Sequence, residues 1–357
     1  MIKVINAVIF ILLLMWFSAG LWLDFPSLPH QSVKAILKGE AVTNTEELIE
    51  KQIPLRQIII EMWAKIRYLL FNEGNSGVLI GKNGWLFSRE EFLWPDNGSD
   101  TLTKNIANMV QLNELLKENN VQLYVVLVPA KAEVYPQYAP FLSAQIQYRL
   151  RETMYNELDS LQINVFDSFT ALSVTSKNEP VFLKTDTHWS WQGAERVAQA
   201  FASQFNYLQK NSHFERTFSA PQCKLGDLTT FIPAGDDWLI AQLGGDVLTV
   251  PYTSLIEDDL DDLFATESSP VLALVGTSYS ADSQWDFVGG LQMALNTEIV
   301  NYALEGEGPF IPMLRFIQDE ILQKRAIRHV IWEVPVRYMI QEPTLTTTFI
   351  QELRSKN

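Results

Sequence analysis

Short apolar segments that alternate with helical patterns constrain the fold of this chain more than any other feature. Five segments have the length and composition of strands: 121–128 (VQLYVVLV), 163–166, 271–275 (VLALV), 298–302 and 329–334 (HVIWEV). Helical patterns lie before or between them, at 101–117, 145–158, 191–205, 289–295 and 310–322. Continuous apolar strands that alternate with helices indicate a mostly parallel sheet with helices on both faces. We therefore predict an α/β fold.

The loops after these strands are the candidate positions for a reactive site, because such sheets carry their functional groups beyond the carboxyl ends of the strands. Gly276, Thr277 and Ser278 directly follow the strand VLALV. A serine at such a turn can expose its hydroxyl above the sheet edge, where backbone N–H groups can stabilise an oxyanion. The motif alone also fits an ordinary helix cap.

A second candidate segment is KTDTHWSW at 184–191, which contains Asp186 and His188. A serine needs a base to become a nucleophile, and the histidine needs a carboxylate to fix its tautomer. Among the four histidines, His188 has a carboxylate two residues before it and a tryptophan directly after it. A structural pair that closes a loop is the alternative. We expect no zinc site, because this segment offers at most two ligands.

The N-terminus contains an uncharged apolar run, VINAVIFILLLMWFSAGLWL at 4–23. About 20 such residues cross the ~30 Å hydrocarbon core of a membrane. Lys3 before the run and Asp24 after it predict a cytoplasmic N-terminus and an exported chain. We predict a transmembrane signal-anchor over residues 1–24, with a cleaved signal peptide as the alternative. A helical stalk or packing segment, with a break at Pro54, follows over 25–75, and one large domain occupies 76–357.

The charge balance excludes some partners. The chain has 27 Lys and Arg against 42 Asp and Glu, which gives a net charge of −15. Nucleic acids require clustered cations, so we do not predict them as partners, and an anionic polysaccharide would need a local basic patch. The single cysteine, Cys223, cannot form an intramolecular disulfide, and no histidine beside it would activate its thiol.

Taken together, the two reactive segments carry a family resemblance. KTDTHWSWQGAERVA at 184–198 and VLALVGTSYSADSQWDFVGGLQMAL at 271–295 resemble the alginate O-acetyltransferases of the AlgX/AlgJ type, which are SGNH-hydrolase-like proteins. Supporting segments are GKNGWLFSREEF at 81–92, VPAKAEVYP at 128–136, NYALEGEGPF at 301–310 and VIWEVPVRYM at 330–339. The chain ends at Asn357, so the resemblance implies the AlgJ layout, without the C-terminal carbohydrate-binding module of AlgX.

The resemblance implies an SGNH-like fold in the permuted order, with Asp and His before the serine. It implies a triad in which Ser278 attacks an acetyl donor, His188 takes the proton and Asp186 orients His188. Ser280, in the same loop, does not match the position of the nucleophile. The acetyl group would pass to an exopolysaccharide hydroxyl in the periplasm, without a bound cofactor or metal. A membrane-bound O-acyltransferase would supply acetyl groups at the inner membrane.

Other residues at strand ends are weaker candidates for a role in the site. Gly306 and Gly308 could lend backbone N–H groups to the site, and Lys131 could hold an anionic sugar. Glu333 could form an ion pair with Arg337 that shapes the cleft. A plain turn and a solvated lysine are the alternatives. The candidates for substrate or oxyanion binding are Lys131, Tyr279, Gly306, Gly308 and Arg337.

Two other functions fit the same residues. An acetylesterase would use the same triad with water as the acceptor, and sequence does not distinguish it from a transferase. A non-catalytic polysaccharide-binding scaffold of an export complex is the third possibility, against which the complete set of Ser278, His188 and Asp186 argues. These residues do not identify the polysaccharide.

Overall fold

The computed structural model describes residues 56–140, 145–173, 179–256, 272–321 and 327–342. They belong to two units, of which the small one comprises Met1–Asn72 with Pro233–Gly235, and the large one comprises Glu73–Ile232 and Asp236–Asn357. The predicted anchor over 1–24 and the first part of the predicted stalk lie outside the described residues. No helix within the described ranges is long and apolar enough to span a membrane.

The described part of the small unit is mainly helical. Helix α4 (Arg56–Ile66) starts the described part of the chain and continues into the π-helical turn η1 (Arg67–Phe71). The helix ends at Asn72, whose left-handed backbone (φ 53°) lets its N–H reach the last carbonyls, a typical C-terminal cap. Ile58, Met62 and Leu70 expose their apolar side chains.

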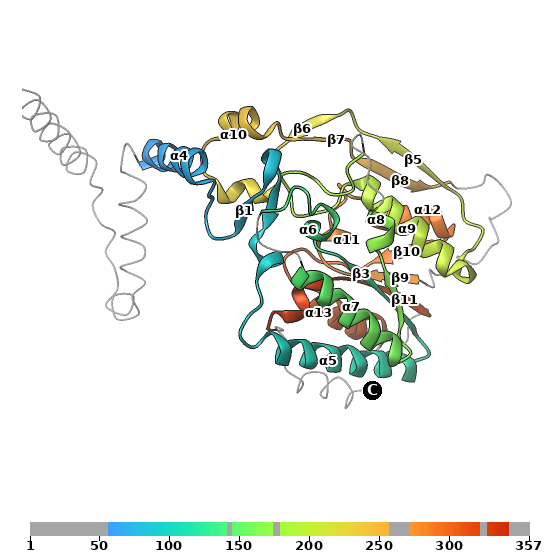
Figure 1. Cartoon of the computed structure of the whole chain (residues 1–357). Coiled ribbons are helices and arrows are strands. Elements are labelled where there is room, and N and C mark those ends of the chain that lie inside the picture. The colour runs from blue at the N-terminus through green and yellow to red at the C-terminus, as the bar shows by residue number, and fades with distance from the viewer. Residues whose placement is uncertain (1–55, 141–144, 174–178, 257–271, 322–326, 343–357) are drawn as a thin grey trace, which may run out of the picture. The chain divides into compact units, whose positions relative to one another are not determined.

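The large unit contains the predicted sheet. Its five strands are ordered β10-β9-β11-β3-β4 (Figure 1), and all neighbouring pairs are parallel. Each strand overlaps one of the five apolar segments, so this part of the prediction is confirmed. The bounds are β3 Gln122–Val128, β4 Asn164–Asp167, β9 Leu272–Val275, β10 Ile299–Asn301 and β11 His329–Pro335.

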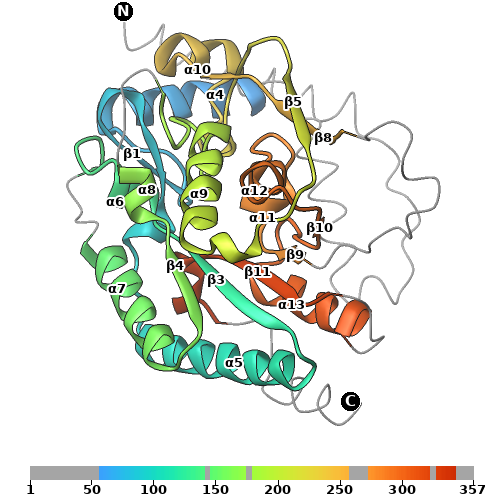
Figure 2. The ribbon, with the colours of Figure 1, turned by 90° about the vertical axis from the view of Figure 1, so that its right-hand side faces the viewer.

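Alternate residues of each strand enter two separate cores, because successive side chains point to opposite faces of a sheet. In β3, Tyr124 and Val126 belong to one buried cluster, and Leu123 and Val125 belong to the other. Helices α9 and α12 cover the first face, and α5, α7 and α13 cover the second (Figures 1 and 2). These helices are α5 Gly98–Glu118, α7 Gln145–Ser160, α9 Trp191–Gln204, α12 Phe287–Leu295 and α13 Phe310–Phe316.

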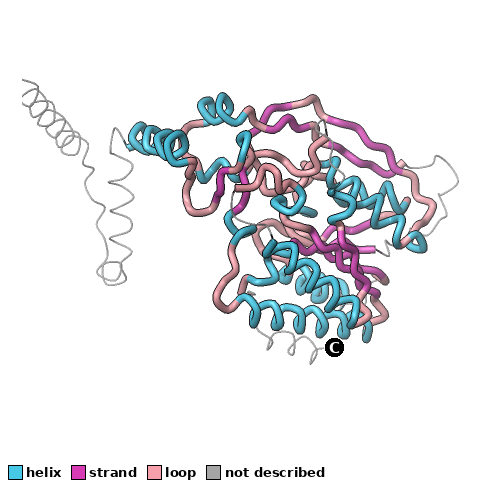
Figure 3. Tube along the Cα trace, in the orientation of Figure 1, coloured by secondary structure: helices cyan, strands magenta, loops and turns pink. Residues whose placement is uncertain are grey.

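Three antiparallel strand pairs accompany the sheet and were not predicted (Figure 3). They pair β1 (Val78–Ile80) with β2 (Leu86–Ser88), β5 (Phe214–Phe218) with β8 (Pro251–Leu255), and β6 (Gln222–Lys224) with β7 (Asp246–Leu248). The shorter helices are α6 Lys131–Val134, α8 Phe169–Ser173, α10 Asp236–Leu243 and α11 Ser278–Ala281. The 3-10 and π turns are η2 Lys82–Gly84, η3 Arg89–Phe92, η4 Asn206–Leu208, η5 Asp227–Phe231, η6 Ile317–Ile321 and η7 Val336–Ile340.

The parallel arrangement brings the candidate loops to one edge of the sheet. Ser278 follows β9, Lys131 follows β3, and Arg337 follows β11. Because all three strands run in the same direction, their carboxyl ends meet at the same edge. The site is built there.

Candidate active site

Ser278 is the first residue of the short helix α11, three residues after β9 ends at Val275. Thr277 caps this helix, since its side-chain oxygen accepts a hydrogen bond from the N–H of Tyr279. The turn therefore presents the Ser278 side chain at the sheet edge, where it is partly exposed.

The segment that carries Asp186 and His188 folds back on itself before α9. The N–H of Leu183 donates to the carbonyl oxygen of His188 at 3.1 Å, and Phe182 and Trp189 form an antiparallel bridge. Asp246, which begins β7, accepts hydrogen bonds from the N–H groups of Lys184 and Thr185 at 2.6 and 2.8 Å. Hydrogen bonds within the segment and hydrogen bonds to Asp246 thus both fix its backbone.

The three predicted residues meet in hydrogen-bond contact. His188 Nε2 lies 2.7 Å from Ser278 Oγ, and His188 Nδ1 lies 2.7 Å from Asp186 Oδ1. The same carboxylate accepts from the backbone N–H of His188 at 2.9 Å and, through Oδ2, from that of Asp227 at 2.9 Å. With Asp186 accepting from Nδ1–H, Nε2 is free to accept the serine proton.

The surroundings keep Asp186 ionised. Burial raises the pKa of its carboxyl, but the hydrogen bonds and charge of His188 outweigh burial and lower this pKa to about 2. The Trp285 ring stacks on the His188 ring, with 5.4 Å between centroids and 20° between planes. The Tyr279 ring lies 4.8 Å from the His188 ring. These aromatic contacts hold the imidazole in place between its two partners.

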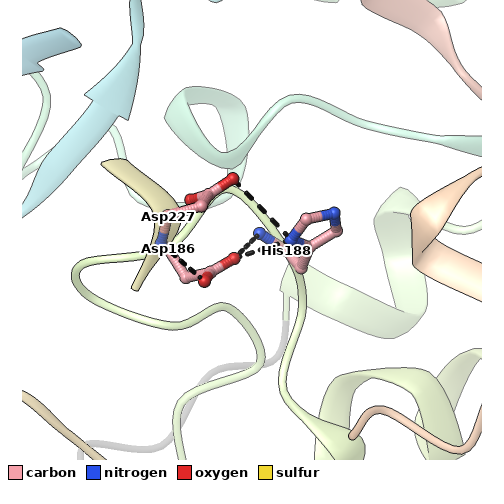
Figure 4. A group of neighbouring side chains, drawn as sticks. All are labelled: Asp186, His188 and Asp227. Carbon is pink, nitrogen blue, oxygen red and sulfur yellow. Dashed lines mark hydrogen bonds and ion pairs between the residues drawn. The ribbon is translucent and has the colours of Figure 1, made fainter. Parts of the chain in front are cut away.

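Asp227 also lies beside His188, a contact that was not predicted from the sequence. Its Oδ2 lies 4.0 Å from His188 Nδ1 (Figure 4). Its Oδ1 accepts from the N–H of Thr187 at 2.7 Å. Burial, followed by the charge of Asp186, raises the pKa of the Asp227 carboxyl. His188 therefore faces two carboxylates of different acidity. A residue 41 positions from Asp186 in the chain carries no local signal of this contact.

The same three side chains offer possible metal ligands. Ligand atoms of Asp186, His188 and Asp227 lie within 4.8 Å of one another. A metal ion on Nδ1 would have to break the 2.7 Å bond to Asp186, and one on Nε2 would break the 2.7 Å bond to Ser278. Both bonds are those that a serine nucleophile and its base require, so the arrangement fits proton transfer better than metal binding.

A cavity of about 360 Å³ opens beside the serine. Ser278, His188 and Asp227 form part of its wall together with Arg89 and Arg337. The space is sufficient for a sugar residue or an acetyl donor next to the hydroxyl of Ser278. Phe231 and Tyr338 add aromatic surface to the same wall.

Arg337 lines this cavity as predicted for a substrate-binding residue, but its guanidinium is already engaged. It donates to the hydroxyl oxygens of Tyr279 and Tyr338 at 2.9 and 3.3 Å and lies 3.4 Å from the Glu90 carboxylate. Tyr279 is buried and donates its hydroxyl to the carbonyl oxygen of Thr187 at 2.9 Å. Its side chain therefore supports the His188 segment and does not line the cavity.

Lys131 does not reach the substrate cavity, contrary to the prediction. It is 1% exposed, and its ammonium donates to the carbonyl oxygens of Leu183, Lys184 and Asp186 at 3.0, 3.4 and 2.7 Å. An ammonium has three donors, so these carbonyls satisfy it completely. Burial lowers the pKa of Lys131. The lysine fixes the backbone of the segment that carries Asp186.

The two glycines that were predicted to lend backbone N–H groups to the site lie outside the wall of the Ser278 cavity. Gly306 and Gly308 line a separate cavity of about 210 Å³, and the wall around Ser278 contains neither. The predicted pairing of Glu333 with Arg337 is replaced by hydrogen bonds from Thr277 and Ser280 to Glu333. Ser280 is buried by this contact, which leaves Ser278 as the serine that faces His188.

Comparison with known proteins agrees with this geometry. The model of the SGNH hydrolase-like domain of the acetyltransferase AlgX matches residues 78–336. The chain belongs to this family. The match spans the whole sheet and both halves of the Ser278–His188 pair.

Relatives of this family extend over most of the chain. The probable alginate O-acetylase AlgJ of Azotobacter vinelandii is 38% identical over 315 residues, which cover 85% of this chain and 80% of the relative. The corresponding protein of Pseudomonas aeruginosa is 33% identical and covers 85% of this chain and 81% of its own length. The solved O-acetyltransferase domain of Pseudomonas putida AlgJ superposes with a TM-score of 0.69 at 30% identity, over 79% of this chain and 99% of that domain.

Proposed function

We propose that this chain is a serine-dependent O-acetyltransferase that acetylates the hydroxyls of an exopolysaccharide, alginate or a related polymer. One observation carries the proposal: Ser278 Oγ lies 2.7 Å from His188 Nε2 beside an open cavity, in a member of an acetyltransferase family. The relatives named alginate O-acetylases support alginate as the acceptor.

The first half-reaction would acetylate the serine. Ser278 Oγ attacks the carbonyl carbon of the acetyl donor while His188 Nε2 takes the hydroxyl proton. The tetrahedral intermediate collapses, the bond to the donor's leaving group breaks, and His188 returns the proton to that group. Asp186 stays ionised and stabilises the imidazolium that forms between these two events.

The second half-reaction would transfer the acetyl group to the sugar. His188 takes the proton of a sugar hydroxyl, whose oxygen attacks the carbonyl carbon of acetyl-Ser278. The ester bond to Ser278 breaks, and Oγ regains the proton from His188. The sugar leaves as an acetyl ester and the enzyme is restored.

The charged groups of the cavity wall are two arginines, Arg89 and Arg337, two carboxylates, Glu90 and Asp227, and the imidazole of His188. Arg89 is exposed, whereas Arg337 is buried. The chain has a net charge of −15, so a local positive region is needed where an acidic polysaccharide approaches. We infer that Arg89 contributes to it, because the guanidinium of Arg337 is already bound to Tyr279 and Tyr338 and lies 3.4 Å from the Glu90 carboxylate.

We also propose that the domain works in the periplasm, held to the inner membrane by an anchor over residues 1–24. The uncharged run at 4–23, with Lys3 before it and Asp24 after it, supports this topology. A membrane-bound O-acyltransferase would then supply acetyl groups to Ser278. Protease added from the periplasmic side should digest the chain from Gly81 onward, and digestion from the cytoplasmic side only would contradict the topology.

The test uses the full-length chain purified in detergent. It is incubated with p-nitrophenyl acetate, with and without an alginate oligosaccharide, and both protein and sugar are analysed by mass spectrometry. We expect an acetyl adduct on Ser278 and an acetylated oligosaccharide, both absent in Ser278→Ala. Ser203→Ala is the matched control, since Ser203 is an exposed serine whose hydroxyl bonds only within α9.

The products separate the competing functions. Release of acetate without any acetylated oligosaccharide would identify an acetylesterase and contradict the transferase. Full activity in Ser278→Ala would contradict the covalent mechanism.

A further inference from the structure

A buried carboxylate lies directly beneath the turn that carries Ser278. It belongs to Glu333, which is 0% exposed and lies near the end of β11. Strand β11 pairs in parallel with β9, and the register matches Trp332 to Val275. The next residue along each strand is Glu333 on one side and Gly276 on the other, so the sheet itself brings the carboxylate to the turn.

The residues on both sides of Ser278 donate to this carboxylate. The backbone N–H of Thr277 donates to Oε2 at 2.7 Å, and the Thr277 hydroxyl lies 3.1 and 3.2 Å from the two oxygens. The hydroxyl of Ser280 donates to Oε2 at 3.1 Å. Ser278 Oγ itself points to His188. The carboxylate thus holds the turn at the residue before the reactive serine and at the second residue after it.

Gly276 makes this close approach possible. A Cβ atom on Gly276 would lie 2.5 Å from Glu333 Oε2 and 3.0 Å from Glu333 Cβ, so a larger residue here would force the glutamate side chain to move. In the segment Gly276-Thr277-Ser278-Tyr279-Ser280, three residues therefore have a physical role besides that of the nucleophile Ser278. The glycine admits the carboxylate, and the threonine and the second serine bind it.

We propose that Glu333 is a positioning residue that sets the location of Ser278 Oγ against His188. The inference rests on the proposed acyl transfer through Ser278. Glu333 is absent from the wall of the cavity, and its hydrogen bonds go to Thr277 and Ser280 of the turn. A displacement of about 1 Å at a reacting atom can reduce the rate roughly 100-fold, which gives such a support a measurable effect.

Two substitutions separate hydrogen bonding from volume. Glu333→Gln keeps an oxygen that can accept from Thr277 and Ser280, and a neutral side chain suits a site where burial raises the pKa of Glu333 to about 7. Glu333→Met has a similar length but no oxygen. We expect Glu333→Gln to retain most of kcat, and Glu333→Met to lower kcat by about 100-fold with an unchanged KM for the oligosaccharide.

A control variant tests for general destabilisation. Thr297 is buried, and its hydroxyl lies 2.9 and 3.2 Å from the carbonyl oxygens of Leu295 and Leu208. It precedes β10, so it lies at the amino ends of the strands, whereas Ser278 lies at the carboxyl ends. Thr297→Val removes these hydrogen bonds at nearly constant volume. We expect a lower thermal midpoint and a wild-type kcat, which shows that loss of buried polar contacts alone does not reproduce the effect of Glu333→Met.

The rate at which phenylmethylsulfonyl fluoride labels Ser278 gives a readout that needs no acceptor. We expect Glu333→Met to slow labelling in parallel with kcat and Glu333→Gln to stay near the wild type. Wild-type labelling by a folded Glu333→Met variant, or equal losses in the Gln and Met variants, would overturn the role of Glu333 alone. Failure of the wild-type chain to label at Ser278 would overturn the proposed acyl transfer and the inference with it.

Discussion

At the scale of single residues, two carboxylates, those of Asp186 and Asp227, lie beside His188 and differ in their contacts with it. Asp186 accepts directly from Nδ1 at 2.7 Å, whereas Asp227 lies 4.0 Å away and is half exposed. The first contact fixes the tautomer and the second adds only charge. The two aspartates should therefore differ strongly in their effect on the rate.

We expect Asp227→Asn to lower kcat by about three- to tenfold, because an ion pair with a half-exposed carboxylate contributes roughly 1 kcal/mol. Asparagine keeps an oxygen for the N–H of Thr187, so the loop should stay in place. Asp186→Asn should lower kcat by a factor on the order of 10⁴, since an amide favours the wrong tautomer of His188. Steady-state rates of oligosaccharide acetylation measure both, and equal losses would contradict the division of roles.

At the scale of secondary-structure elements, the start of α9 fixes the end of the Asp186–His188 segment. Ser190 is the N-cap: its oxygen accepts from the N–H of Gly193 at 3.1 Å, and its hydroxyl donates to the carbonyl oxygen of Pro180 at 2.5 Å. Ser190 lies only two residues after His188. A weaker cap should therefore affect both the helix and the site.

Replacing Ser190 by alanine should lower the free energy of unfolding by about 1 kcal/mol, the usual value of an N-cap. Ser190→Gly should cost more, because Ser190 is 3% exposed, which limits the access of water to the freed N–H groups, and glycine adds conformational freedom to the unfolded chain. Urea unfolding curves of the three proteins test this order. An alanine variant as stable as the wild type would show that the cap contributes nothing.

The same elements show what the sequence could predict. The strands of the sheet were found because runs such as VQLYVVLV are apolar on both faces. The pair β5–β8 was missed, since most of the residues in both strands are partly or fully exposed and their pairing joins distant segments. Asp186 and His188 were found because they lie two residues apart, Ser278 was found because it follows the strand VLALV, and the family resemblance joined the three. The burial of Lys131 was missed, because its carbonyl partners lie 52 to 55 residues away.

At the scale of the whole molecule, buried acids make stability depend on pH. Burial raises the pKa of Glu133 and Glu333 to about 7, from an ordinary value of 4.5. Between these two values the folded chain binds more protons than the unfolded chain, so the free energy of unfolding falls as pH rises. Asp186, with a pKa of about 2, acts in the opposite direction but only below an ordinary value of 3.8.

We therefore expect the urea midpoint of the wild-type protein to fall between pH 5 and pH 7.5. Each glutamate contributes on the order of 3 kcal/mol to this decrease, since one unit of pKa shift corresponds to about 1.4 kcal/mol. The double variant Glu133→Gln, Glu333→Gln carries neither titrating group, so its midpoint should fall less over the same range. Parallel pH profiles for the two proteins would contradict this account, because the decrease would then arise from other groups on this strongly acidic chain.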